Sequence, residues 1–309
     1  MNGIDRTQGS REAGYLSEVD FEGVFVPNVT PFKDGEIDEG SLRRLVDYLI
    51  DGGANGLVPC GTTGESATLS HDEHIDVIRM VAEQAAGRVP VIAGIGTNDT
   101  AESLRLVRKA EELDLQGYLV VCPYYNRPNQ EGIISHFRAV SDVTERPVLV
   151  YNIPMRTGRN IEVGTVVELS RIPNIVGIKD ASGSIDDTMN IIAGTKDFRV
   201  LSGEDHLLFS ICCLGGNGGI LASGHVLPGE FLALCKAVWE GDLEEARRLH
   251  YHLLPLVRVM FKEPNPAPAK AAMKLLGVID SDELRLPLLN VSAACREDIA
   301  GVLHGLKLL

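Results

Sequence analysis

The sequence lacks several features that define whole classes of proteins. None of its apolar runs approaches the roughly 18 residues that a helix needs to cross a bilayer. Residues 1–20 have no apolar centre of the kind found in signal peptides and are typical of a mobile tail. The zinc motif H-E-x-x-H, the dinucleotide motif G-x-G-x-x-G and the P-loop are absent as well. These absences argue against a membrane protein and against metal, dinucleotide or nucleotide cofactors.

The net charge and the cysteines further limit the classes of protein and partner that fit the sequence. The formal net charge of −14 disfavours nucleic acid and anionic membranes as partners, so an anionic substrate must find a local basic group. The six cysteines form no C-x-x-C pair, which predicts reduced, buried thiols in a cytoplasmic protein. With 44% hydrophobic residues, the 309-residue chain suits one large α/β barrel with an appendage, or two ordinary domains.

Residues 23–223 alternate short β-rich runs with amphipathic stretches whose apolar residues recur at three- and four-residue spacing. The predicted strands are 24–30, 56–60, 89–95, 117–122, 148–152, 175–179, 199–202 and 219–222. The predicted helices between them include 39–50, 71–85, 101–113 and 130–144. Eight βα units in roughly 200 residues predict a (β/α)8 TIM barrel, with a doubly wound open sheet as the alternative.

The alternation stops near residue 229, where only helical patterns continue. These lie at 231–239, 243–260, 267–276 and 292–306, and a proline-rich turn at 263–266 interrupts them. We therefore divide the chain into a tail (1–20), a barrel that carries the active site (21–228) and a C-terminal helical region (229–309). The last region is expected to pack against the barrel or against a neighbouring chain.

Lys179 closes the apolar stretch 175–178 at the end of a predicted strand. Desolvation of an ammonium group is costly, so burial there would leave a fraction of neutral, nucleophilic amine that can form a Schiff base with a carbonyl substrate. The segment alone also fits a lysine that leaves the sheet and reaches water.

Other polar residues follow the predicted strands in the same way. In a TIM barrel, side chains at the carboxyl ends of the strands converge on one mouth. Singly, each is compatible with an ordinary turn, strand or loop residue. Together with Lys179, the hydroxyls, phenols and guanidinium predict an active site that handles carbonyl compounds. The residues are Thr62, Thr63, Tyr124, Tyr125, Tyr151 and Arg156.

Four ordered segments carry a resemblance to a known family. They are G-T-T-G-E-S at 61–66, P-Y-Y-N-R-P at 123–128, Y-N-I-P-M-R-T-G at 151–158 and G-I-K-D-A at 177–181. They resemble the pyruvate-dependent class I aldolases of the N-acetylneuraminate lyase superfamily, and most closely the dihydrodipicolinate synthase family. The resemblance runs from about Phe21 to the carboxyl end. It implies condensation of pyruvate with L-aspartate 4-semialdehyde to give 4-hydroxy-tetrahydrodipicolinate, the first committed step of the diaminopimelate route to lysine, without metal or nucleotide.

The resemblance also implies a role for each catalytic residue. Lys179 would form the Schiff base with pyruvate, and Tyr151 would be the acid/base that shuttles protons. Thr63 would link Tyr151 to Tyr125, which in this family comes from the neighbouring subunit across a dimer interface. The family is most often a tetramer formed as a dimer of dimers.

The substrate contacts are implied in the same way. Thr62, Thr63 and the backbone near Gly61 would hold the pyruvate carboxylate, and Ile220 would contact substrate. Arg156 would bind the carboxylate of the second substrate through a bidentate fork.

Three other functions remain open at this point. N-acetylneuraminate lyase and the 2-keto-3-deoxy sugar acid aldolases share the lysine and tyrosine, but they need hydroxyl-rich pockets for polyol chains. Arg156 favours a carboxylated second substrate instead. A barrel that binds a keto acid as a sensor, without turnover, is the alternative from a different class.

Seven further positions match the allosteric L-lysine site of feedback-inhibited members of the family. The resemblance implies that Glu102 neutralises the ligand's amine, while His71, Ser66 and Asn98 contact its polar ends. The alternative is ordinary helix-start polarity, because Ser70 and Glu73 make a capping box, which also argues against a metal at 71–74. The seven positions are Ser66, Ala67, His71, His74, Asn98, Glu102 and Tyr124.

Overall fold

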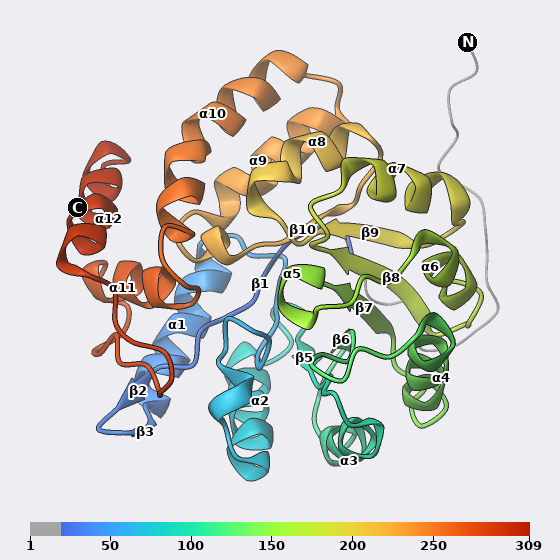
Figure 1. The fold of residues 1–309 in the computed structure, drawn as a ribbon. Coiled ribbons are helices and arrows are strands. Elements are labelled where there is room, and N and C mark those ends of the chain that lie inside the picture. The colour runs from blue at the N-terminus through green and yellow to red at the C-terminus, as the bar shows by residue number, and fades with distance from the viewer. Residues whose placement is uncertain (1–19) are drawn as a thin grey trace.

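The computed structural model describes residues 20–309, so the tail predicted at 1–20 lies outside the described residues except for Asp20. Eight parallel strands form one sheet in the order β4-β1-β10-β9-β8-β7-β6-β5. A parallel bridge between Leu57 and Val91 joins the two edge strands, so the sheet closes on itself (Figure 1). The predicted TIM barrel is confirmed, and the open sheet is excluded. The strands are β1 (Gly23–Val26), β4 (Gly56–Leu57), β5 (Ile92–Gly94), β6 (Gly117–Val121), β7 (Val148–Asn152), β8 (Ile175–Asp180), β9 (Arg199–Ser202) and β10 (Gly218–Ile220).

Three of the predicted strands extend too far because each includes a proline. Pro27 follows β1, Pro59 lies two residues beyond β4, and Pro90 lies two residues before β5. Proline has no backbone N–H to donate to a sheet ladder, so regular pairing stops near it. Of the five strands without proline, four end within one residue of their predicted limits, and β10 ends two residues before its predicted end at 222.

Helices surround the barrel on its outside (Figure 1). The predicted ends of α3 and α4 were three residues too long, because Leu113 and Val143 continue the apolar pattern from turns that still pack on the core. The helices of this part are α1 (Glu39–Asp51), α2 (His71–Ala85), α3 (Thr100–Ala110), α4 (Gln130–Ser141), α5 (Pro154–Thr157), α6 (Val163–Leu169), α7 (Ile185–Gly194) and α8 (Leu208–Cys213). A short antiparallel hairpin, β2 (Phe32–Lys33) and β3 (Glu36–Ile37), precedes α1.

The C-terminal part contains α9 (Pro228–Trp239), α10 (Leu243–Met260), α11 (Ala267–Leu275) and α12 (Ala293–Gly305). Helix α9 packs on β1 and α10, and α12 packs on α10 and α11. The predicted helices are confirmed, while the division of the chain at residue 228 stays a proposal. Figure 1 shows α10, α11 and α12 grouped on one side of the barrel.

The core has two layers, as strand alternation requires. Phe25, Leu149 and Leu201 belong to the cluster inside the barrel, whereas Val24 and Val150 belong to the cluster between the strands and the helices. In residues 20–309, no helix has both the length and the apolar character that crossing a membrane requires. All six cysteines are free, and five are buried; the prediction of a buried thiol is wrong for Cys213, which is exposed beside the end of α8.

Candidate active site

Lys179 and Tyr151 lie side by side on neighbouring strands. Strands β7 and β8 pair in parallel in a register that places Tyr151 opposite Lys179. Both residues are buried, with 5% and 6% of their surface exposed, and the Lys179 Nζ lies 4.3 Å from the centroid of the Tyr151 ring. Across residues 20–309, no carboxylate forms an ion pair with Lys179. The amine therefore lies over the face of the tyrosine ring.

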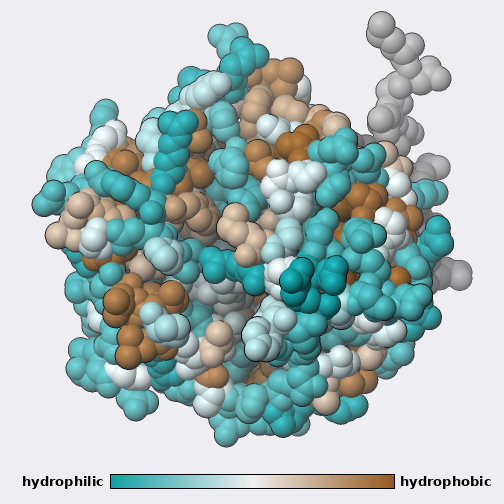
Figure 2. Space-filling model, viewed as in Figure 1, coloured by the Kyte–Doolittle hydropathy of each residue, from teal (hydrophilic) through white to brown (hydrophobic). Residues whose placement is uncertain are grey.

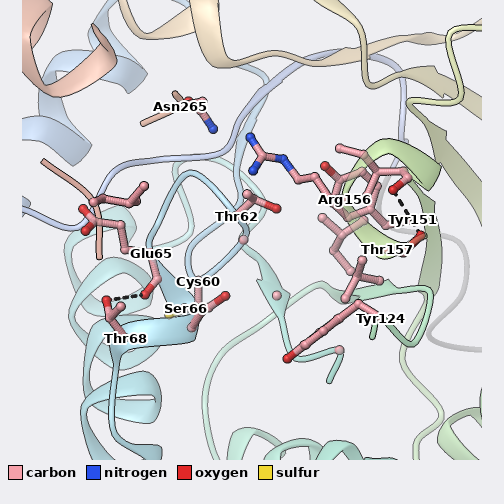
Figure 3. Close-up of a pocket in the computed structure, with 18 of the residues that line it drawn as sticks. Cys60, Thr62, Glu65, Ser66, Thr68, Tyr124, Tyr151, Arg156, Thr157 and Asn265 are labelled. Atoms are coloured by element: carbon pink, nitrogen blue, oxygen red, sulfur yellow. Dashed lines mark hydrogen bonds between the residues drawn. The ribbon is translucent and has the colours of Figure 1, made fainter. Parts of the chain in front are cut away.

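Lys179 opens into a cavity of about 560 Å³ at the carboxyl ends of the strands, which we call the Lys179 cavity. The predicted residues Thr62, Thr63, Tyr151, Arg156 and Ile220 line it with Lys179. A second cavity of about 340 Å³, the Tyr124 cavity, is lined by Ser66, Ala67 and Tyr124. Both cavities share walls formed by Thr62, Tyr151, Ile153, Arg156, Pro264 and Asn265 (Figure 3).

The threonine turn, residues 61–64, connects the two cavities. Gly64 N–H donates to the Gly61 carbonyl and Glu65 N–H to the Thr62 carbonyl, each at 3.1 Å. The N–H groups of Thr62 and Thr63 have no protein acceptor within the described part of the chain, so they are free to bind an anion. The Thr63 hydroxyl accepts a hydrogen bond from Asn265 Nδ2 at 3.0 Å. Within residues 20–309, no hydrogen bond makes the predicted link from Thr63 to Tyr151. Of the two threonines, only Thr62 borders both cavities.

The Tyr125 side chain does not share a cavity with Tyr151 within one chain. It lines neither cavity, 88% of its surface is exposed, and its φ of 71° lies in the left-handed region. A non-glycine residue in that region is held there at a cost, which is often found at functional sites. The side chain therefore projects away from its own barrel.

Arg156 comes from the short helix α5, which begins at Pro154 directly after β7. Figure 3 shows its guanidinium extending into the cavity. The side chain makes no ion pair with any carboxylate of residues 20–309, so its charge is available to a ligand.

The seven positions of the predicted L-lysine site do not share one cavity. Ser66, Ala67 and Tyr124 line the Tyr124 cavity, but His71, His74, Asn98 and Glu102 do not. Glu102 pairs with His71 Nδ1 at 2.5 Å and also with Arg105.

The neighbouring helix α2 explains one of these positions. His74 is buried and donates through Nε2 to the Gly94 carbonyl at 2.7 Å, and burial lowers the pKa of His74. The capping box of Ser70 and Glu73 is confirmed. In addition, Glu73 pairs with Arg285.

Sequence reasoning missed seven polar residues of the Lys179 cavity, namely Glu204, Asp205, His206, Arg258, Lys262, Glu263 and Asn265. Glu204 and Asp205 follow β9, so the rule that strand ends face the mouth could have found them. Burial raises the pKa of both carboxyls, and Asp205 Oδ2 accepts the Ser223 N–H at 2.6 Å. Asn265 comes from the turn before α11, and no pattern in the sequence connects it with the threonine turn.

Comparisons with a family profile, with related sequences and with solved structures all identify the same family. The profile of the dihydrodipicolinate synthetase family matches residues 20–305. A 4-hydroxy-tetrahydrodipicolinate synthase of Nitratidesulfovibrio vulgaris (strain DP4) is 49% identical over 271 residues, which cover 87% of this chain and 92% of that protein.

Two solved structures superpose with a TM-score of 0.91 each. One is the enzyme of Cyanidioschyzon merolae with lysine bound, 38% identical, covering 94% of this chain and 99% of that one. The other is a chloride-inhibited dihydrodipicolinate synthase of Acinetobacter baumannii in complex with pyruvate, 37% identical, covering 94% and 100%.

Proposed function

The chain belongs to the dihydrodipicolinate synthetase family, and from that premise we propose that it is a lyase that condenses pyruvate with L-aspartate 4-semialdehyde through a Schiff base on Lys179. The observation that carries the proposal is the buried Lys179 amine, 4.3 Å from the Tyr151 ring, in a cavity that also contains an unpaired Arg156. The pyruvate complex of the A. baumannii relative supports the first substrate. The enzyme would work in the cytoplasm.

The proposed chemistry needs a proton donor and acceptor beside the amine. The neutral Lys179 amine adds to the keto carbon of pyruvate, and loss of water leaves a protonated imine. Removal of a methyl proton gives an enamine, whose carbon attacks the aldehyde of the second substrate. The amine of that substrate then displaces Lys179 and closes the ring. Tyr151 is the group we assign to these proton transfers, because its ring lies against the amine.

We assign different tasks to the two threonines. Thr62 borders both cavities, which supports it as the hydroxyl between Tyr151 and the surface that carries Tyr125, in place of Thr63. Thr63, with its hydroxyl held by Asn265, then binds the pyruvate carboxylate together with the free N–H groups of the turn. Ile220 forms the apolar wall of the same site.

Tyr125 acts across a dimer interface in this proposal. Its exposed side chain on a strained backbone is what a residue donated to a neighbouring subunit requires. Leu286 and Leu289, with 76% and 72% of their surface exposed, lie on the loop whose Pro287 and Leu288 line the Tyr124 cavity. Figure 2 shows apolar surface on this face of the molecule. A second copy would cover this surface, and two such dimers would form the tetramer.

Substitution of Arg156 tests whether the second substrate carries a carboxylate that this side chain binds. Arg156→Ala should leave pyruvate trapping by borohydride intact, because Lys179 is untouched. It should lower kcat/KM for L-aspartate 4-semialdehyde by roughly ten- to a hundredfold, since a charge-assisted bond to a carboxylate contributes about 1.5–3 kcal/mol. Arg156→Lys should give an intermediate loss, because it keeps the charge but not the planar fork. A coupled assay that finds faster cleavage of N-acetylneuraminate than condensation would overturn the proposed substrate.

We also propose that L-lysine inhibits the enzyme by binding at the Tyr124 cavity. The C. merolae relative was solved with lysine bound, and Tyr124 lies next to Tyr125 in the chain. A ligand that touches Tyr124 could disturb the proton relay without entering the Lys179 cavity. Because only three of the seven positions line this cavity in one chain, we place the complete site at the dimer interface, where Glu102 would be released from His71 to meet the ligand's amine.

Inhibition should be non-competitive with respect to pyruvate, and Glu102→Ala should weaken it at least about fivefold, since allosteric couplings are typically 1–3 kcal/mol. The measurements are initial rates and calorimetry with L-lysine. Asp76→Ala is the matched control, because it removes a carboxylate from α2 that pairs only with Arg79 at the surface. Equal inhibition of wild type and Glu102→Ala would leave the helix-start interpretation of this cluster.

A further inference from the structure

Asn265 is the one residue from the C-terminal helical part that makes a hydrogen bond to the threonine turn through its side chain in residues 20–309. Its Nδ2 donates to Thr63 Oγ1 at 3.0 Å, across 202 positions of sequence. It lines both cavities, and Figure 3 shows its side chain on the side of Thr62 and Arg156 in the Tyr124 cavity. Pro264 and Pro266 flank it, and both restrict the backbone at this point. The Ala267 N–H donates to the Pro264 carbonyl at 3.0 Å, so the turn is tied to the start of α11.

The bond to Asn265 determines what the Thr63 hydroxyl can do. A hydroxyl group has one proton to donate and two lone pairs that accept. The Asn265 amide occupies one lone pair, and no residue of the described chain accepts the Thr63 proton. That proton is therefore available to an acceptor in the Lys179 cavity, beside the free N–H groups of Thr62 and Thr63. A donor on the oxygen also polarises the hydroxyl, which strengthens the bond that it donates.

We propose that Asn265 is a positioning residue for the keto acid: it holds the Thr63 hydroxyl as an acceptor, so that the hydroxyl proton is directed at the substrate carboxylate. This inference rests on the proposed use of pyruvate. It gives the C-terminal helical part a role in binding the first substrate, although that part contributes no reacting group. Asn265 acts through Thr63 and does not itself contact the reacting atoms.

A carboxylate contact is present both before and during the reaction, so its loss should raise KM for pyruvate and leave kcat nearly unchanged. We expect Asn265→Ala to raise that KM about tenfold, which corresponds to the net contribution of one such hydrogen bond. Asn265→Asp should raise it further, to about a hundredfold, because an acceptor with a negative charge replaces the donor beside an anion site. A role in packing alone predicts the opposite order, since aspartate keeps the shape of asparagine and alanine does not.

A double-mutant cycle tests whether the effect passes through Thr63. Thr63→Val removes the hydroxyl and should also raise KM for pyruvate about tenfold, while Thr63→Ser keeps the hydroxyl and should stay near the wild type. Adding Asn265→Ala to Thr63→Val should then change KM by less than about twofold. If the two residues acted independently, their effects on KM would multiply. Thermal unfolding of each variant identifies any that fail to fold. If Asn265→Asp fails to fold, the double-mutant cycle still tests the inference, because it uses only Thr63→Val and Asn265→Ala.

Two results would overturn the inference. One is an Asn265→Asp variant that is folded and binds pyruvate better than Asn265→Ala. The other is a full tenfold effect of Asn265→Ala that persists in Thr63→Val. Failure of the proposed function would look different, because the wild type would then show no pyruvate adduct under borohydride.

Discussion

Borohydride reduction in the presence of pyruvate should add one pyruvate-derived group per chain, at Lys179, and Lys179→Ala should remove both the label and turnover. The loss of turnover should be at least about 10³-fold, since the covalent route disappears with its nucleophile. Lys179→Arg should be equally inactive, because a guanidinium keeps the charge but does not deprotonate. Mass spectrometry of the reduced protein locates the label.

Lys270 is the internal control for this experiment. It is the other buried lysine of residues 20–309, but its Nζ pairs with Glu65 and donates to the Glu283 carbonyl at 2.7 Å. Burial lowers the pKa of Lys270 to about 8, but Lys270 lines neither cavity, whereas Lys179 lines the cavity that we assign to pyruvate. A label on Lys270, or on any lysine other than Lys179, would contradict the mechanism.

The sequence predicts the barrel well because each βα unit carries its own local signals. Alternating burial, helix caps and turns are encoded within a few residues, so the helix α2 and its capping box at Ser70 are found with the right limits. The errors arise where an apolar pattern continues past the point at which the element ends. A proline just beyond β1 stops the ladder although the apolar run continues, and Leu113 extends a helical pattern past the end of α3.

The residues of the site divide in the same way into those that local sequence signals predict and those that they do not. The positions of Lys179 and Tyr151 in one cavity could be predicted because both residues end barrel strands, and neighbouring parallel strands bring such residues together. Asn265 could not be predicted, because its bond to Thr63 depends on how a turn 202 residues away folds back over the mouth. Tyr125 is a different case, because it projects from the molecule and the place that we propose for it depends on a second chain, which a single sequence does not describe.

Glu65, the residue that follows the threonine turn, forms an ion pair with Lys270 of the C-terminal part, and both side chains are fully buried. Lys270 also lies over the Phe32 ring, with 4.2 Å between Nζ and the ring centroid, and Glu65 Oε2 accepts the Arg285 N–H at 3.2 Å. The backbone of Glu65 is in the left-handed region, with a φ of 54°, and its N–H donates to the Thr62 carbonyl. The buried Glu65 carboxylate therefore holds the end of the turn that carries Thr62. A buried pair of this kind contributes little net free energy when it is complete, but half of it is very unfavourable.

Lys270→Met should therefore lower the free energy of unfolding by about 3–5 kcal/mol, because it leaves the Glu65 carboxylate buried without a counter-charge. The double variant Glu65→Leu, Lys270→Met should recover most of that loss, since the apolar side chains fill similar volume without a charge to desolvate. Arg248→Ala is the matched control, because its pair with Glu245 is exposed and should change stability by no more than about 1 kcal/mol. Urea unfolding at a fixed protein concentration measures all three, which keeps the contribution of subunit association constant. If Lys270→Met were no less stable than Arg248→Ala, the pair would not hold the turn, and the anchoring of the threonine turn would rest on Asn265 alone.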